Sequence, residues 1–258
     1  MTNLLIGVPA YADGADVSAS EAFDSRYSLE NLIAGGRSRL GILDAAADSV
    51  TITVDVGSAS RTIDFFYVAR ANILKAQGAT RLKLSGDISG DIAGTDVDLQ
   101  SLDLYGHGDQ DAIFTSELNN SDVGGLSDTS TNESYDIVIG QAGVDDEVCW
   151  GFSKFMFGEW FDFGRDPESR SIEEVWKKGG RDPYLEITFI WRGISKEKKD
   201  SAISTIIENR ERGCILYTRD YHAPLLSRRV MHSFIERYET NYLSDQQYDM
   251  SITFREQI

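Results

Sequence analysis

The chain has 258 residues, of which 41% are hydrophobic, and its formal net charge is −17. This length allows one large or two ordinary domains, and no apolar run reaches the roughly 18 residues that a membrane span needs. The charge is uneven, because residues 1–150 hold 8 Lys/Arg and 24 Asp/Glu whereas residues 151–258 hold 17 and 18. Such an acidic first part repels phosphate backbones, which argues against nucleic-acid binding and favours two parts with different surroundings.

We expect no secretory signal at the start of the chain, because this segment lacks a basic stretch and contains Pro9. Residues 1–28 are small, acidic and aperiodic, so we expect an extended N-terminal arm or a strap ordered on a neighbouring subunit. The two cysteines, Cys149 and Cys214, are far apart in the sequence. They are interpreted as reduced, buried thiols, with a disulfide as the alternative.

Residues 29–163 are expected to form a β-sandwich, because short strand-like segments alternate there with turn-rich ones. Residues 86–98 and 119–133 are rich in Gly, Asp, Ser and Asn and are predicted to be loops. The predicted strands are residues 51–56, 63–69, 81–85, 99–105 and 135–140.

Residues 149–163 contain seven aromatic side chains. Large rings bury much area, so this density favours a seam between two domains. The alternative is an exposed binding surface, on which Trp150, Trp160 and Phe161 would form a platform for a glycan.

Residues 164–258 are predicted to form a second β domain, because two segments alternate with a period of two and so have one buried and one wet face. A helix over residues 195–212 separates them, with Ser195 as its N-cap and Gly213 after its end. The apolar positions of the two strands are Leu185, Ile187, Phe189 and Trp191, and Tyr248, Met250, Ile252 and Phe254. Those of the helix are Ala202, Ile203, Ile206 and Ile207.

The predicted fold class is therefore mainly β: an N-terminal jelly-roll β-sandwich plus a C-terminal β-sandwich or barrel carrying one packed α-helix. The three expected segments are the arm at residues 1–28, the sandwich at residues 29–163 and the helix-bearing domain at residues 164–258.

The sequence contains no phosphate-binding glycine loop, no zinc-protease motif, no nucleophile elbow and no CxxC pair. The histidines His107, His222 and His232 are scattered and are interpreted as surface or packed residues. We therefore assign no catalytic residue, no cofactor and no metal ligand, and expect a protein that is not an enzyme.

One acidic segment invites a calcium assignment, because carboxylates are the ligands that Ca²⁺ prefers. Its spacing matches no calcium-binding loop, so solvated side chains are the favoured interpretation. The carboxylates concerned are Asp87, Asp91, Asp96 and Asp98, with Asp109 and Asp111 further on.

Residues 31–85 resemble the discoidin-like (galactose-binding-like) jelly rolls of tailed-bacteriophage virion proteins. The turn Asp55-Val56-Gly57 leads into the apolar strand Ile63–Val68 and then Arg81–Ser85. Residues 155–193 are similar to the segment that follows the jelly roll in those proteins.

The C-terminal part is similar to a strand–helix–strand unit of phage tail-tube, distal-tail and tail-tip proteins. The matching elements are Trp191-Arg192-Gly193-Ile194-Ser195 and Ser251-Ile252-Thr253-Phe254-Arg255-Glu256.

These resemblances imply a structural virion protein, most simply a distal-tail or tail-tip component. They imply a homo-oligomeric ring that joins the tail tube to the hub, the fibres and other host-recognition proteins, assembled in the bacterial host cytoplasm. The first alternative is a carbohydrate- or receptor-binding virion module that holds a host-surface glycan. The second is a hydrolase with an accessory β-sandwich, which the absent motifs disfavour.

Overall fold

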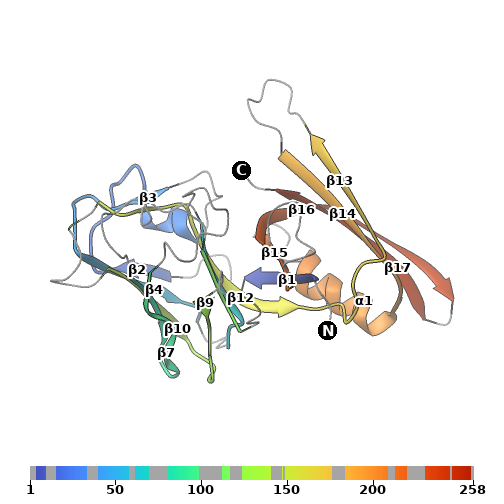
Figure 1. The fold of residues 1–258 in the computed structure, drawn as a ribbon, viewed down its shortest axis with the longest axis horizontal. Helices are drawn as coiled ribbons and strands as arrows, with labels where there is room; N and C mark the ends of the chain where they lie inside the picture. Colours follow the sequence, from blue (N-terminus) through green and yellow to red (C-terminus); the bar gives the residue numbers. More distant parts are fainter. Residues whose placement is uncertain are drawn as a thin grey trace. The chain divides into compact units, whose positions relative to one another are not determined.

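Strands dominate the structure, a computed structural model (Figure 1), and the described residues contain one α-helix, so the predicted mainly β class is confirmed. Within the described residues, no helix is long and apolar enough to cross a membrane. The structure describes residues 4–9, 16–33, 40–57, 62–69, 81–98, 112–116, 124–140, 147, 149–175, 184–208, 213–219, 230–244 and 246–256.

The chain forms two compact units, and one is inserted into the other in sequence. Unit 1 consists of residues 1–8 and 160–258, and unit 2 consists of residues 9–159. Unit 2 therefore follows the first strand of unit 1 and precedes all its other strands. This arrangement differs from the predicted succession of an arm and two domains.

The predicted arm at residues 1–28 is wrong for the two strands that lie within it. Strand β1 (Leu4–Pro9) is buried along its whole length and pairs antiparallel with β15 (Cys214–Thr218) in unit 1. Strand β2 (Asp16–Ala19) pairs with β4 (Ser49–Asp55) in unit 2. The partner of β1 lies near the other end of the chain, and no local pattern reveals such a pairing.

Unit 1 contains an antiparallel sheet with the strand order β13-β14-β17-β16-β15-β1. The alternation predicted for its two long central strands is confirmed, because Ile187, Phe189 and Trp191 are buried beside Met250 and other apolar residues. The remaining strand bounds are β13 (Ser169–Val175), β14 (Tyr184–Ser195), β16 (Val230–Ser244) and β17 (Gln247–Glu256).

A β-bulge in β14 explains the Trp-x-Gly element. The pairing of β14 with β17 shifts between Trp191 and Ile194, and Gly193 adopts a left-handed φ of 62°. The backbone N–H of Gly193 donates to a carboxylate oxygen of Asp249 at 3.1 Å. Because the bulge adds a residue, both Trp191 and Ile194 face the core.

The predicted helix is present over its first part, as α1 (Lys196–Ala202) followed by a π-helical turn (Ile203–Ile207). The Ser195 hydroxyl accepts a hydrogen bond from the Lys198 backbone N–H at 3.2 Å, which confirms the N-cap. Ala202, Ile206 and Ile207 are buried in the core of unit 1, as the apolar stripe predicts. Residues 209–212 lie outside the described residues.

Unit 2 is a β-sandwich whose two main sheets enclose one hydrophobic core. The five-stranded sheet has the order β2-β4-β10-β6-β7, and the second sheet has the order β12-β5-β8-β9. Strand β5 (Phe65–Ala69) is buried on both faces, as predicted. The other bounds are η1 (Leu29–Leu32), β3 (Gly41–Ile42), β6 (Arg81–Gly86), β7 (Gly90–Asp98), β8 (Ala112–Thr115), β9 (Gly124–Gly125), β10 (Ser134–Gly140), β11 (Gly151–Phe152) and β12 (Lys154–Phe161).

The prediction of a loop over residues 86–98 is wrong, because most of this segment is strand β7. Gly90 has a φ of 70° and closes a short turn, after which the chain pairs back onto β6 with two register shifts. A neighbouring strand thus orders a segment that its glycines and aspartates alone would not. The predicted strand at residues 99–105 lies outside the described residues, as do residues 119–123 of the second predicted loop.

Candidate functional site

Two carboxylates of the acidic segment, those of Asp87 and Asp91, have polar partners within unit 2. An Asp87 carboxylate oxygen accepts the backbone N–H groups of Glu133 and Ser134 at 2.9 and 3.3 Å. The Asp91 carboxylate lies 2.6 Å from the Lys83 ammonium. The side chains of Asp96, Asp98, Asp109 and Asp111 lie outside what the structure describes. Within the described residues, no group of three His, Cys, Asp or Glu side chains could hold a metal ion.

The fully buried Asn132 holds the turn between β6 and β7, and the sequence reasoning missed it. Its side-chain oxygen accepts the backbone N–H groups of Ile88 and Ser89, each at 2.9 Å. Its amide nitrogen donates to an Asp128 carboxylate oxygen at 3.0 Å and to the Ser130 carbonyl at 2.9 Å. Both polar atoms of this amide are hydrogen-bonded within the protein, which gives Asn132 a structural role.

Asp128 belongs to the same hydrogen-bond network as Asn132. Its carboxylate accepts the Ile63 backbone N–H at 2.8 Å, the Tyr135 hydroxyl at 3.1 Å and the Ser89 hydroxyl at 2.5 Å. Burial raises the pKa of the Tyr135 hydroxyl, so this group remains a donor. The turn that Asp128 and Asn132 hold exposes Ile88, whose surface is 63% accessible.

We predict that removing divalent ions leaves the protein unchanged. Because Asp87 and Asp91 already have partners within the chain, EDTA should alter the melting temperature by less than about 2 °C. A bound ion at 100-fold excess over its dissociation constant would contribute about 2.7 kcal/mol, which corresponds to several degrees. Differential scanning fluorimetry with EDTA and then with added Ca²⁺ tests this, and a drop that Ca²⁺ restores would contradict it.

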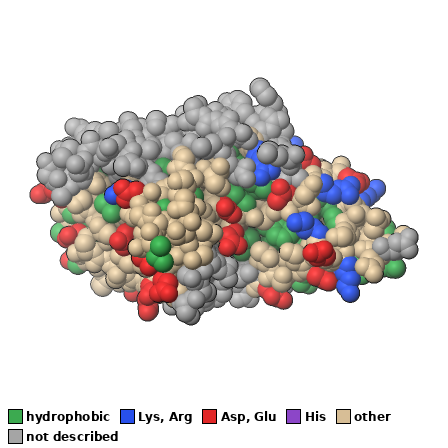
Figure 2. All heavy atoms as spheres, turned by 90° about the horizontal axis from the view of Figure 1, so that it is seen from below, with side chains coloured by type: hydrophobic (Ala, Val, Ile, Leu, Met, Phe, Trp, Pro, Cys, Tyr) green, Lys and Arg blue, Asp and Glu red, His purple; other side chains and the backbone are tan. Residues whose placement is uncertain are grey.

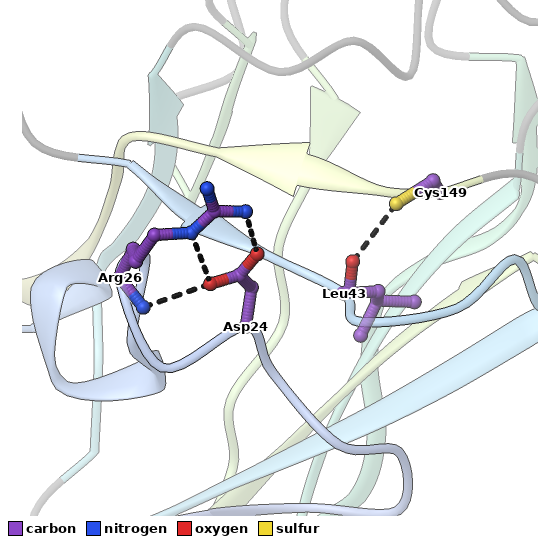
Figure 3. A network of polar contacts seen from close by, with 4 residues as sticks. All are labelled: Asp24, Arg26, Leu43 and Cys149. Atoms are coloured by element: carbon purple, nitrogen blue, oxygen red, sulfur yellow. Dashed lines mark hydrogen bonds and ion pairs between the residues drawn. The ribbon is translucent and has the colours of Figure 1, made fainter.

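A small polar cluster lies beside β3 in unit 2 (Figure 3). The Arg26 guanidinium donates twice to the Asp24 carboxylate, at 2.7 and 3.1 Å, and the Arg26 backbone N–H donates at 2.8 Å. The guanidinium also lies 5.7 Å from the ring centre of Tyr27, which is 39% exposed. An exposed ring beside a planar ion pair offers both stacking and hydrogen bonds to a ligand.

The Asp24 carboxyl is expected to titrate unusually low. Hydrogen bonds from the side chain and then the backbone of Arg26 hold its pKa at about 2, below the ordinary value of 3.8. The folded pKa is lowered, so its stabilising contribution is present above the unfolded value and is lost as the pH falls from about 3.8 towards 2. Carbon-detected NMR titration measures this midpoint, and Arg26→Gln should raise it; equal midpoints in both proteins would contradict the assignment.

The alternative interpretation of residues 149–163 as an exposed glycan platform is wrong, because Trp150 and Phe161 are buried. Trp160 is half-buried and stacks on Tyr217, with ring centres 5.3 Å apart. The aromatic segment instead supplies both cores. Trp150, Phe152, Phe155 and Phe157 belong to the core of unit 2, and Phe161 and Phe163 belong to that of unit 1.

Neither cysteine forms a disulfide, and only one of them is buried. Burial raises the pKa of the Cys214 thiol, which donates to the Ser233 carbonyl at 3.5 Å. Cys149 is exposed, contrary to the prediction, and donates to the Leu43 carbonyl at 2.8 Å (Figure 3). His232 is buried on β16, which agrees with its interpretation as a packed residue. His107 and His222 lie outside the described residues.

The sheet of unit 1 has two strand edges that lack a partner among the described residues, one along the end strand β13 and one along part of the inner strand β16. β13 pairs only with β14, and β15 pairs with residues 230–233 alone of the long strand β16. From Phe234 to Ser244, therefore, β16 has a described partner, β17, on one side only. Exposed strand edges carry unpaired N–H and C=O groups that can pair with another chain.

The far part of β16 is also exposed on both of its faces. Every residue from Glu236 to Ser244 is exposed, although successive side chains point to opposite faces. Tyr238, Tyr242 and Leu243, at 37%, 65% and 50% exposure, are among the large apolar residues at the surface. This part of β16 has one described partner strand and carries exposed apolar side chains, so it is suited to contact another chain.

No protein-family model matches the chain, and no curated protein matches it. Among solved structures, the chain is similar to chitosan-binding module 1 of a chitosanase/glucanase from Paenibacillus sp. IK-5. The identity is 12% and the TM-score 0.39, over 58% of this chain and 97% of that one. It is also similar to CBM32-1 of a family 31 glycoside hydrolase from Clostridium perfringens, with 11% identity, a TM-score of 0.38, and 59% and 96% of the chains covered. Likenesses this weak carry no argument about function, and the sandwich of unit 2 is established by its own strand pairing.

Proposed function

We propose that this protein is a structural component of a phage tail, at the distal tail or tail tip. It would form a homo-oligomeric ring between the tail tube and the host-recognition proteins, without catalysis. It would be assembled in the cytoplasm of the bacterial host and would function in the virion. The sequence resemblance to tail proteins motivates this proposal, and the edges of β13 and of β16 beyond Ser233, which lack a described partner, support it.

The edges suggest how such a ring would close. A β13 edge of one subunit and a β16 edge of the next are different surfaces, so their pairing is heterologous. Heterologous contacts repeat head to tail and give a ring when the rotation closes. The exposed Tyr238 and Tyr242 would add buried area at each contact.

Light scattering after size-exclusion chromatography at micromolar concentration tests the proposal, and a multimer is expected. Tyr238→Lys combined with Tyr242→Lys should give monomers. In natural proteins, lysine side chains on an edge strand prevent it from pairing with a strand of another chain. Ser201→Lys combined with Ser204→Lys, on exposed positions of the helix, is the matched control and should still assemble. A wild-type protein that stays monomeric and is absent from virions would refute the proposed function.

A second candidate function is glycan binding by unit 2, and the exposed Tyr27 beside the Asp24–Arg26 pair favours it. Affinity electrophoresis through gels containing host polysaccharide measures it. Tyr27→Ala should abolish any retardation, whereas Tyr242→Ala in unit 1 should leave it unchanged. Equal retardation of both variants would exclude Tyr27 as the site, and no retardation of the wild type would exclude this function for that polysaccharide.

A further inference from the structure

The two units differ sharply in charge. Unit 2 holds 9 Lys/Arg and 25 Asp/Glu, a net charge of −16, whereas unit 1 holds 16 and 17, a net charge of −1. No Lys or Arg occurs between Lys83 and Lys154. On the face shown in Figure 2, most of the Lys and Arg side chains lie over unit 1, and carboxylates are spread over unit 2. The excess negative charge of the molecule is therefore concentrated in one unit.

Most of the carboxylates of unit 2 whose side chains the structure describes are exposed. Two ion pairs there join partners that are both described, Asp24–Arg26 and Lys83–Asp91. Unit 1 contains Arg165–Glu168, Lys199–Asp200, Arg219–Asp162 and Arg255–Glu236. Exposed carboxylates of unit 2 without an assigned structural role are Asp16, Glu21, Asp44 and Glu133.

We propose that repulsion between copies of unit 2 regulates assembly, so that subunits associate through unit 1 only when the ionic strength screens unit 2. This inference rests on the proposed ring. Each added subunit brings a further copy of unit 2, with its charge of −16, into the assembly, and like charges oppose association. The nearly neutral unit 1 adds little to this repulsion, which leaves its strand edges as the surfaces that can meet.

The range of the repulsion depends strongly on salt. The screening length is about 30 Å at 10 mM salt and about 8 Å at 150 mM. At 10 mM, charges on neighbouring copies of unit 2 would act on one another across distances comparable with a domain. Assembly should therefore become stronger as salt is added, which is the opposite of the behaviour of an interface held by charge attraction.

Sedimentation velocity of the full chain at 10 and 150 mM NaCl tests the inference. The apparent dissociation constant should fall on the order of tenfold or more as salt rises. A multimer whose stability is independent of salt, or which weakens with salt, would overturn the inference and leave the proposed ring intact. A protein that is monomeric under both conditions would instead overturn the proposed ring, and the inference with it.

A variant with fewer charged side chains on unit 2 provides a second test of the inference. The combined substitutions Asp16→Asn, Glu21→Gln, Asp44→Asn and Glu133→Gln change the charge of unit 2 from −16 to −12. This variant should assemble more strongly than the wild type at 10 mM NaCl, and the two should converge at 150 mM. Identical assembly at 10 mM, or a difference that persists at 150 mM, would show that charge on unit 2 is not the cause.

Discussion

Replacing Ile206 by aspartate should destabilise unit 1 more than any exposed substitution in the helix. Ile206 is 2% exposed and packs into the core of unit 1. Loss of its buried area costs roughly 2 kcal/mol or more, and an unpaired carboxylate adds a desolvation penalty. In a protein of this size, the expected fall in melting temperature is on the order of 10 °C, measured by differential scanning calorimetry.

Ser204→Asp is the matched control, because it places the same side chain on an exposed position of the same helix. It should change the melting temperature by no more than about 2 °C. If Ile206→Asp expressed normally and melted like the control, the helix would not be packed against the unit 1 sheet as described.

Asn132→Ala should be the most damaging polar substitution in unit 2. It would leave the backbone N–H groups of Ile88 and Ser89, whose hydrogen bonds are partly buried, without their acceptor and would remove the donor to Asp128. A hydrogen bond contributes about 0.5–1.5 kcal/mol net, so the loss of these three bonds is expected to cost roughly 3 kcal/mol in urea unfolding.

The adjacent Glu133→Ala is its control, since the side chain of Glu133 is exposed and only its backbone N–H bonds to Asp87. Faster amide hydrogen exchange at Ile88 and Ser89 should accompany Asn132→Ala and not Glu133→Ala. Unchanged exchange at these two residues would contradict the role of Asn132 in holding the turn.

Long alternating segments could be read directly from the sequence. The strands β4, β10, β14 and β17 follow a period of two, and one face of each is buried in a core. The helix start was equally predictable, because Ser195 supplies a local cap. In these elements the local pattern and the tertiary packing favour the same structure.

The missed elements depend on distant partners. Strand β1 is formed by pairing with β15, and strand β7 by pairing with β6. The sequence of neither segment therefore predicts a strand by itself. The insertion of unit 2 into unit 1 follows from the pairing of β1 and was missed for the same reason.

The candidate sites were less predictable than the fold. A buried asparagine that satisfies two backbone N–H groups has no sequence signature, so Asn132 resembled any other loop residue. The aromatic segment indicated correctly that large rings bury area, but composition could not tell that Trp150 and Phe161 belong to different cores. The edges of β13 and of β16 beyond Ser233, which lack a partner among the described residues, emerge only from the strand order and the pairing register.

Assembly through the edges of unit 1 is the central claim, and electron microscopy of the purified full chain at 150 mM NaCl tests it most directly. Closed rings of uniform diameter are predicted for the wild type, and isolated particles for Tyr238→Lys combined with Tyr242→Lys. Wild-type particles that remain single at micromolar concentration, or rings that persist unchanged in this variant, would contradict the claim.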